Sequence, residues 1–169
     1  MKKVLFTAAF AVAGLVSVSA QTSGVEGTVH VGIPVGDASD FSSFNLGVDL
    51  AYLHPITSNF KLGAKVGYDH FIAKSDYKDF GGKDFGFIPL AATAKLEFNN
   101  NLFIGADLGY AFAATDNIDG GLFWQPKFGY SGSSFDVYAA YKGISVDNDL
   151  PNVRNFNADA VSLGFAYKF

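Results

Sequence analysis

From residue 25 onward, apolar and polar residues alternate along most of the chain, and no apolar stripe at helical spacing persists. Alternation with a period of two is typical of strands that have one apolar and one polar face. The pattern predicts an all-β fold with eight strands, over residues 25–33, 44–54, 60–70, 85–98, 102–112, 121–130, 135–142 and about 158–169.

The connections between these segments alternate between long and short. Short connections fall at 55–59, 99–101 and 131–134, whereas longer polar ones fall at 34–43, 71–84, 113–120 and 143–157. Successive antiparallel hairpins would place every long loop at one end of the sheet, as in an up-and-down barrel. Pro89 and Pro126 lie inside predicted strands, where each removes a hydrogen-bond donor, so we expect a bulge or a strand end at both.

Alternation by itself does not say which face points inward, because a lipocalin-like soluble barrel also alternates. Glycine decides the question, since a solvent-exposed strand face loses stability by using it, whereas the crowded interior of a narrow barrel needs it. The polar face carries seven glycines: Gly47, Gly63, Gly67, Gly105, Gly109, Gly129 and Gly164. We therefore predict that the polar face lines the interior and the apolar face points outward.

The predicted interior carries charges of both signs, which are tolerable in a barrel when they are paired and hydrogen-bonded. The six acids and five bases expected to form this lumenal network are Glu26, Asp49, Asp69, Glu97, Asp107 and Asp136 with Lys61, Lys65, Lys95, Lys127 and Lys142. Alternation also turns Phe87, Phe103, Phe123 and Tyr138 inward. These aromatic residues either fill the lumen or mark places where the register slips.

The outward face has no charge within the eight segments, and its aromatic residues gather at the two ends. Two such girdles are typical of strands that cross a membrane. Each segment is also close to the roughly 9–11 residues that a tilted strand needs to span a bilayer.

The last eight residues, SLGFAYKF, end the chain on an aromatic residue. Ser162, Gly164, Tyr167 and Phe169 resemble the C-terminal assembly signal of bacterial outer-membrane β-barrels. With the eight strands, this segment makes the chain similar to the small OmpA-like and porin-like barrel family. The resemblance implies a monomer in the outer membrane of a Gram-negative-type bacterium, inserted by the outer-membrane assembly machinery and in contact with membrane lipid and lipopolysaccharide. Family members serve in envelope integrity, adhesion or minor permeation.

The first residues have the features of a secretory signal peptide. Lys2 and Lys3 precede an apolar run from Val4 to Val16, and a small-residue cleavage site ends at Ala20. We therefore expect a signal peptide over 1–20 and one barrel domain over 21–169. Removing two lysines leaves 10 basic against 16 acidic residues, a net charge of −6, which disfavours nucleic-acid binding. The chain has no cysteine, so it forms no disulfide or thiolate metal site.

Candidate catalytic chemistry is sparse. His70 is the best candidate base, with Asp69 beside it and Ser75 following, but no histidine has the serine two places on that lipid-A deacylases carry. A nucleophile paired with a base is therefore lacking, and we expect no enzyme and no cofactor. Acidic loop segments at 116–120 and 147–149 could bind divalent cations, but Asp, Asn and Gly also favour plain turns, so no metal site is assigned.

The sequence thus favours a non-enzymatic outer-membrane barrel that has a structural or surface-interaction role and a lumen filled by side chains. A narrow porin-like channel for small solutes is the main alternative. A lipid-modifying enzyme and a soluble ligand carrier are the less favoured ones.

Overall fold

The computed structural model describes residues 24–115, 118–146 and 156–169. Long strands dominate this part of the chain, as the alternation predicts. The strands are β1 (Val25–Val35), β2 (Ser42–Pro55), β3 (Phe60–Ala73), β4 (Phe85–Glu97), β5 (Leu102–Ala113), β6 (Gly121–Ser131), β7 (Phe135–Val146), the two-residue β8 (Phe156–Asn157) and β9 (Asp159–Lys168).

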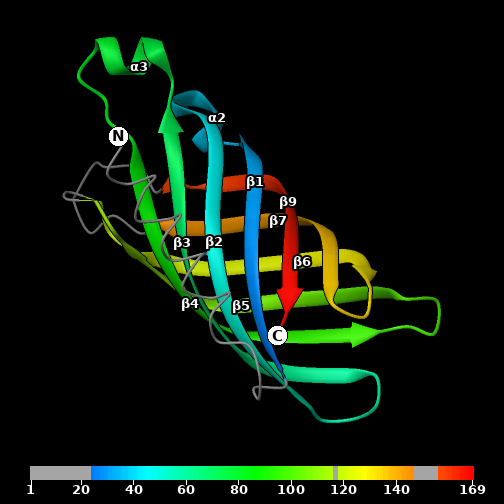
Figure 1. Cartoon of the computed structure of the whole chain (residues 1–169). Helices are drawn as coiled ribbons and strands as arrows, with labels where there is room; N and C mark the ends of the chain where they lie inside the picture. Colours follow the sequence, from blue (N-terminus) through cyan, green and yellow to red (C-terminus); the bar gives the residue numbers. More distant parts are fainter. Residues whose placement is uncertain (1–23, 116–117, 147–155) are drawn as a thin grey trace.

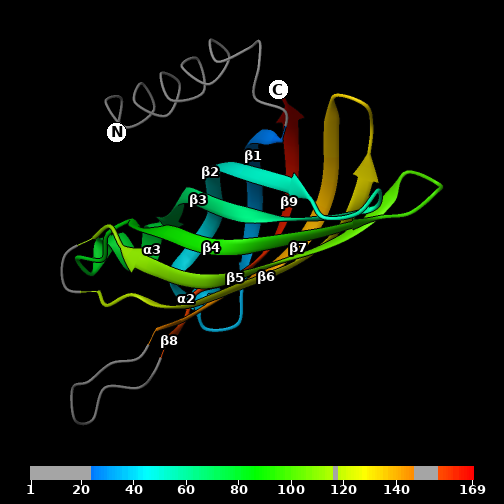
Figure 2. The same ribbon diagram turned by 90° about the horizontal axis from the view of Figure 1, so that it is seen from below.

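The long strands form one closed antiparallel barrel (Figures 1 and 2). Each strand from β1 to β7 pairs with the next in sequence, and β9 lies between β7 and β1. The short β8 adds a rung to the end of β7. In the described part of the chain, the barrel wall therefore has eight strands, and the predicted eight-stranded up-and-down fold is confirmed.

The structure differs from the predicted elements near the long loops. Two short helices, α2 (Ala38–Phe41) and α3 (Ser75–Asp79), lie in segments expected to be irregular, and β3 and β7 run to Ala73 and Val146. Helices of four and five residues are too short to show a periodic apolar stripe. No helix among the described residues is both long and apolar enough to span a membrane.

The expectation of a bulge or strand end at Pro89 and Pro126 is wrong. Pro89 pairs in register with Ala111, and Pro126 pairs with Ala106. Each proline also faces a second neighbouring strand, β3 for Pro89 and β7 for Pro126. The proline itself is unpaired on that side, but the register of the two strands is the same before and after it. The missing donor thus costs a local ladder bond without shifting the strand. The strand register shifts instead between Ser42 and Phe44, at the start of β2.

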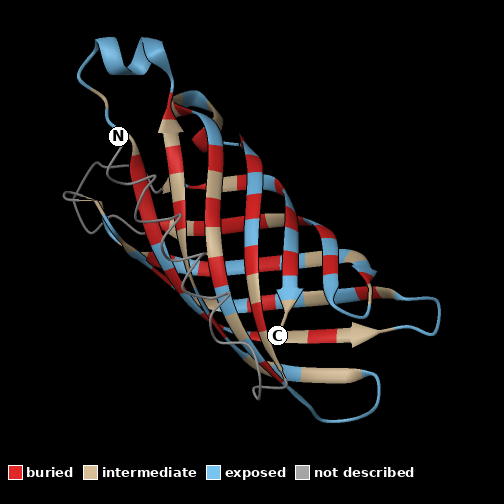
Figure 3. Cartoon of the chain, in the orientation of Figure 1, coloured by how far each residue is buried: buried red, intermediate tan, exposed pale blue. Residues whose placement is uncertain are grey.

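The two faces of the strands are arranged as the glycine pattern predicts. Buried and exposed residues alternate along the strands (Figure 3), with Leu108 61% and Leu163 63% exposed on the outside and Asp107 and Asp136 each 2% exposed on the inside. Close approach explains the inward glycines: a Cβ atom at Gly164 would overlap the Tyr138 ring. The apolar face therefore points outward, and charged residues line the lumen.

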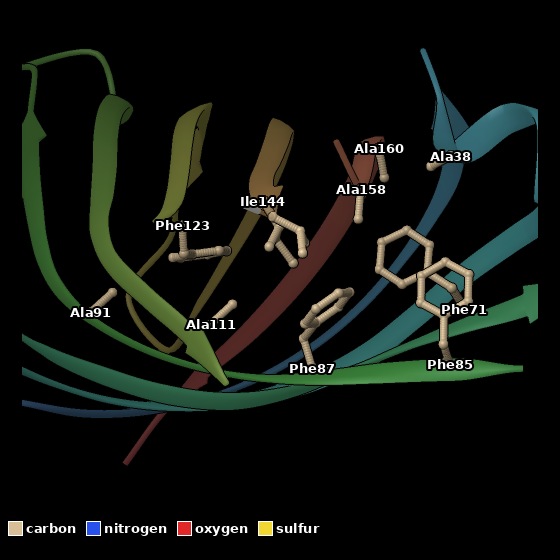
Figure 4. Close-up of a cluster of buried hydrophobic side chains, with 11 residues drawn as sticks. Ala38, Phe71, Phe85, Phe87, Ala91, Ala111, Phe123, Ile144, Ala158 and Ala160 are labelled. Carbon is tan, nitrogen blue, oxygen red and sulfur yellow. The ribbon is translucent and has the colours of Figure 1, made fainter. Parts of the chain in front are cut away.

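The end of the lumen beside the long loops is filled by apolar side chains, here called the loop-end cap. Phe71 and Phe85 stack with ring centroids 5.0 Å apart, and Phe87 packs edge-on against both. The cap consists of Ala38, Phe71, Phe85, Phe87, Ala91, Ala111, Phe123, Ile144, Val146, Ala158 and Ala160 (Figure 4). All are buried, so side chains occupy this end of the barrel.

Candidate functional site: the charged lumen

The charged residues nearest the loop-end cap gather around His30 of β1. Its Nε2 atom lies 3.6 Å from a carboxylate oxygen of Asp49 and 3.6 Å from one of Asp69. Lys142 forms an ion pair with Asp69, and its Nζ lies 3.4 Å from His30 Nδ1. All four side chains are buried, so the two acids are compensated by nearby donors rather than by bulk water.

Lys65 of β3 occupies the centre of the lumen. Its ammonium group lies 3.1 Å from Asp49 and 3.1 Å from Asp107, and it donates a 2.8 Å hydrogen bond to the side-chain oxygen of Gln125. Lys127 pairs with the second oxygen of Asp107 at 2.8 Å. These contacts join β2, β3, β5 and β6 across the interior, and they give the ammonium group of Lys65 three oxygen neighbours.

A third group of charges lies at the end of the lumen beside the short turns. Lys95 contacts Glu26 at 3.5 Å and Glu97 at 3.2 Å, and it also pairs with Asp136. Lys61 pairs with Glu97 at 2.9 Å. The structure therefore brings all the predicted lumenal residues into ion pairs.

Lys168 is a further lumenal base that the predicted set lacks. Its Nζ lies 2.7 Å from Asp136, 2.8 Å from Ser131 Oγ and 2.8 Å from the Gly132 carbonyl oxygen. Alternation would have identified it, because Lys168 lies between the outward residues Tyr167 and Phe169. Counting this residue, the ion pairs among the described residues join six acids and six lysines of the interior, so the formal charges of this set balance.

Aromatic rings inside the barrel line the same charges. The ammonium of Lys65 lies 5.1 Å from the centre of the Phe123 ring, that of Lys95 lies 4.8 Å from Phe103, and that of Lys127 lies 5.7 Å from Tyr138. Cation–π contacts of this kind stabilise a partly desolvated cation. The inward aromatic residues thus fill the lumen, and the strand register does not slip at them.

A small cavity remains among the charges on the turn side. Its volume is about 30 Å³, and its lining includes Asp49, Lys65, Lys95, Lys127 and Tyr138. This volume suits roughly two water molecules, at about 10–15 Å³ each. One oxygen of Asp49 has no hydrogen-bond partner among the described residues and could accept a bond from such water. The cavity is too small for an organic solute.

The four residues of the proposed assembly signal lie on both faces of β9. Ser162 is 1% exposed and Gly164 lies against Tyr138, so both face the lumen. Tyr167 is 48% exposed on the outside, and its ring packs edge-on against Phe169 at 5.1 Å. The aromatic pair of the signal is therefore accessible on the outer wall, next to the turn end.

The residues considered for catalysis do not converge. Asp69 is buried in the lumen, whereas His70 points to the opposite face of β3, as consecutive strand residues do. His70 contacts the Tyr68 hydroxyl at 3.2 Å and Asp84 at 3.9 Å, and Ser75 begins α3. Among the described residues, no group of three or more metal-binding side chains converges. The acidic segment 147–149 and residues 116–117 lie outside the described residues.

The loop that carries α3 is fixed to the barrel rim by Asp84. This carboxylate accepts a 2.8 Å hydrogen bond from the Ala73 amide and lies 2.7 Å from the ammonium of Lys78. Partial burial works to raise the pKa of Asp84, but the bonds from Lys78 and Ala73 outweigh it and hold the pKa below the ordinary 3.8. On the tip of this loop, Phe80 is 92% exposed.

No family model and no curated sequence matches the chain. Solved structures do match it. Ail, the attachment invasion locus protein of Yersinia pestis, is 13% identical with a TM-score of 0.54, over 88% of this chain and 100% of that one. Neisserial surface protein A is 17% identical with a TM-score of 0.51, over 88% and 98%. A de novo designed transmembrane β-barrel is 13% identical with a TM-score of 0.52, over 89% and 98%. The chain therefore has the fold of the small eight-stranded outer-membrane β-barrels.

Proposed function

We propose that this protein is an integral outer-membrane β-barrel with a structural or surface-interaction role, whose lumen is closed by its own side chains. The observation that carries the proposal is the inversion of polarity. Aliphatic and aromatic residues cover the outside of the wall, while charged residues are buried within it. A soluble ligand carrier would need the opposite arrangement, because water would contact the apolar wall.

The outer wall has the vertical order expected in a bilayer. Near the turn end lie Tyr52, Tyr130 and Tyr167, which are 50%, 47% and 48% exposed. Nearer the long loops, Tyr110 and Trp124 are 46% and 37% exposed. Tyrosine and tryptophan favour the two membrane–water boundaries, because their rings combine an apolar body with a polar group. Their placement supports a membrane-spanning wall with the long loops at one surface.

The contents of the lumen support a closed barrel. The loop-end cap is apolar and buried, and the centre is crossed by the contacts of Lys65 with Asp49 and Asp107. Eight strands enclose just enough space for side chains. A hydrated solute would have to displace the phenyl rings and break buried ion pairs, which favours a closed lumen over the alternative of a narrow porin-like channel.

A surface role is supported by the position of the loops and by the structural relatives. The α3 loop holds Phe80 in solvent between Lys78 and Lys83, on a segment fixed to the rim by Asp84. Loops that a rigid scaffold positions are common binding sites, so this anchored loop suits contact with a partner. Ail is named as an attachment invasion locus protein, and Neisserial surface protein A is named as a surface protein. We extend the general role of surface contact, but no particular ligand, to this chain.

Cell fractionation followed by gel electrophoresis tests the membrane assignment. Residues 1–20 should be absent from the mature protein, which should fractionate with the outer membrane and migrate differently with and without boiling. Extraction from cells without detergent, as a soluble protein, would contradict the proposal.

Single-channel recording in planar bilayers separates a closed barrel from the channel. We expect no stable wide-pore openings from the purified wild-type protein. Large and sustained conductance steps would instead support the porin-like alternative.

A further inference from the structure

The seam where the barrel closes is flanked by charges at the turn end. The last strand, β9, lies between β7 and β1, so it is the strand whose pairing completes the barrel. Lys168 of β9 is opposite Glu26 of β1 in the register, and Asp136 of β7 is opposite Ala166. The first, last and penultimate strands of the wall thus each carry an inward charge at this level.

Lys95 reaches the same place from the far side of the barrel. It lies on β4, which is separated from β9 by three strands in either direction around the wall. Its ammonium contacts Glu26 of β1 at 3.5 Å and also pairs with Asp136 of β7. In the closed barrel, one lysine therefore joins the two strands that flank β9.

Lys168 fixes the inserted strand itself. Its three donors are directed to Asp136 of β7, to Ser131 Oγ at the end of β6 and to the Gly132 carbonyl in the turn between these two strands. The neighbouring Tyr167 and Phe169 face outward and contact each other. At the end of β9, Lys168 therefore contacts the lumenal charges, whereas the two aromatic residues lie on the outer wall.

We propose that Lys95 and Lys168, with Glu26 and Asp136, form a closure latch that holds β9 between β7 and β1 after the barrel has closed. This inference rests on the proposed function as an assembled membrane barrel. The acids of the latch are buried or nearly so, and removing a partner of such a pair leaves an uncompensated charge. Before closure, β7 and β1 are not both adjacent to β9, so the charges would instead stay hydrated.

Hydrogen exchange of the full mature chain, refolded into phosphatidylcholine vesicles, tests the latch. Lys95→Met and Lys168→Met remove its two cations. Lys127→Met is the matched control. The side chain of Lys127 is 14% exposed against 18% for Lys168 and has one carboxylate at 2.8 Å, but its ion pair joins β5 and β6, not the strands of the seam. We expect the amides of β1 and β9 to exchange about tenfold faster or more in the latch variants. In Lys127→Met, the β1 and β9 amides should exchange as in wild type.

A disulfide across the seam provides a second, independent measurement. The chain has no cysteine, so introduced pairs are unambiguous. The seam pair is Val29→Cys with Phe165→Cys, at positions that face each other across β1 and β9. The control pair is Val48→Cys with Tyr68→Cys, at positions that face each other across β2 and β3. In the Lys168→Met background, oxidation of the first pair should restore slow exchange at the seam, and oxidation of the second should not.

The outcomes separate the latch from the proposed function. If the latch variants exchange at the seam no faster than Lys127→Met, or if both disulfides restore protection equally, the latch is refuted. If a latch variant does not refold, recovery of folding by oxidising the seam pair supports the latch, and recovery by either pair alike refutes it. If wild type itself fails to insert into vesicles, the membrane assignment is refuted instead.

Discussion

Leu108→Arg tests the polarity of the barrel wall most directly. Leu108 lies near the middle of β5, points outward and is 61% exposed. Its cross-strand neighbours are Ala92 and Trp124, so an introduced guanidinium has no carboxylate beside it on this face. In the hydrocarbon layer the substitution should cost about 2–4 kcal/mol. That cost lowers the ratio of folded to unfolded protein by about 30- to 700-fold, at about 1.4 kcal/mol per factor of ten.

Urea unfolding in lipid vesicles, followed by the fluorescence of Trp124, measures this cost. Ile56→Arg is the control, because Ile56 is 56% exposed in the turn between β2 and β3, outside the membrane-facing wall. It should change the free energy of unfolding by less than about 0.5 kcal/mol. If Leu108→Arg proved as stable as wild type and Ile56→Arg, the outer wall would not be in contact with hydrocarbon, and the membrane assignment would be refuted.

Three further substitutions address the cap, the assembly signal and the loop anchor. Phe87→Ala should destabilise the barrel by about 3–5 kcal/mol in the same urea assay, because it leaves a cavity in the packed cap; a loss below about 1 kcal/mol would show that the cap is loosely packed. Phe169→Ala should lower the amount of assembled protein in the outer membrane, and unchanged abundance and heat-modifiable mobility would count against the assembly role. Asp84 has a pKa below its ordinary value, so its stabilisation of the loop is present above pH 3.8 and is lost as pH falls through the folded-state pKa. Exchange of the Ala73 amide should therefore be faster in Asp84→Asn than in wild type at pH 6, and equal rates would refute the anchoring role.

The sequence by itself determined the architecture of the wall. Strict alternation assigned each strand residue to one of two faces, and the glycines on the polar face identified that face as the crowded interior. The alternating loop lengths then gave the up-and-down order. These features are local, because a side chain's face depends on its position along its own strand. The same alternation places Lys168 on the polar face of the last strand, although the predicted set of lumenal charges does not include it.

The tertiary structure decided how the interior is filled. Alternation turned Phe87 and Phe123 inward without showing that they meet in one cap, and it could not assign Lys95 to Glu26 or Lys142 to Asp69. The two partners in each of these ion pairs are 69 and 73 positions apart in the sequence. Their meeting depends on the stagger of all the strands when the sheet closes. Helices α2 and α3 depend on rim contacts too, since one turn of helix is not stable alone.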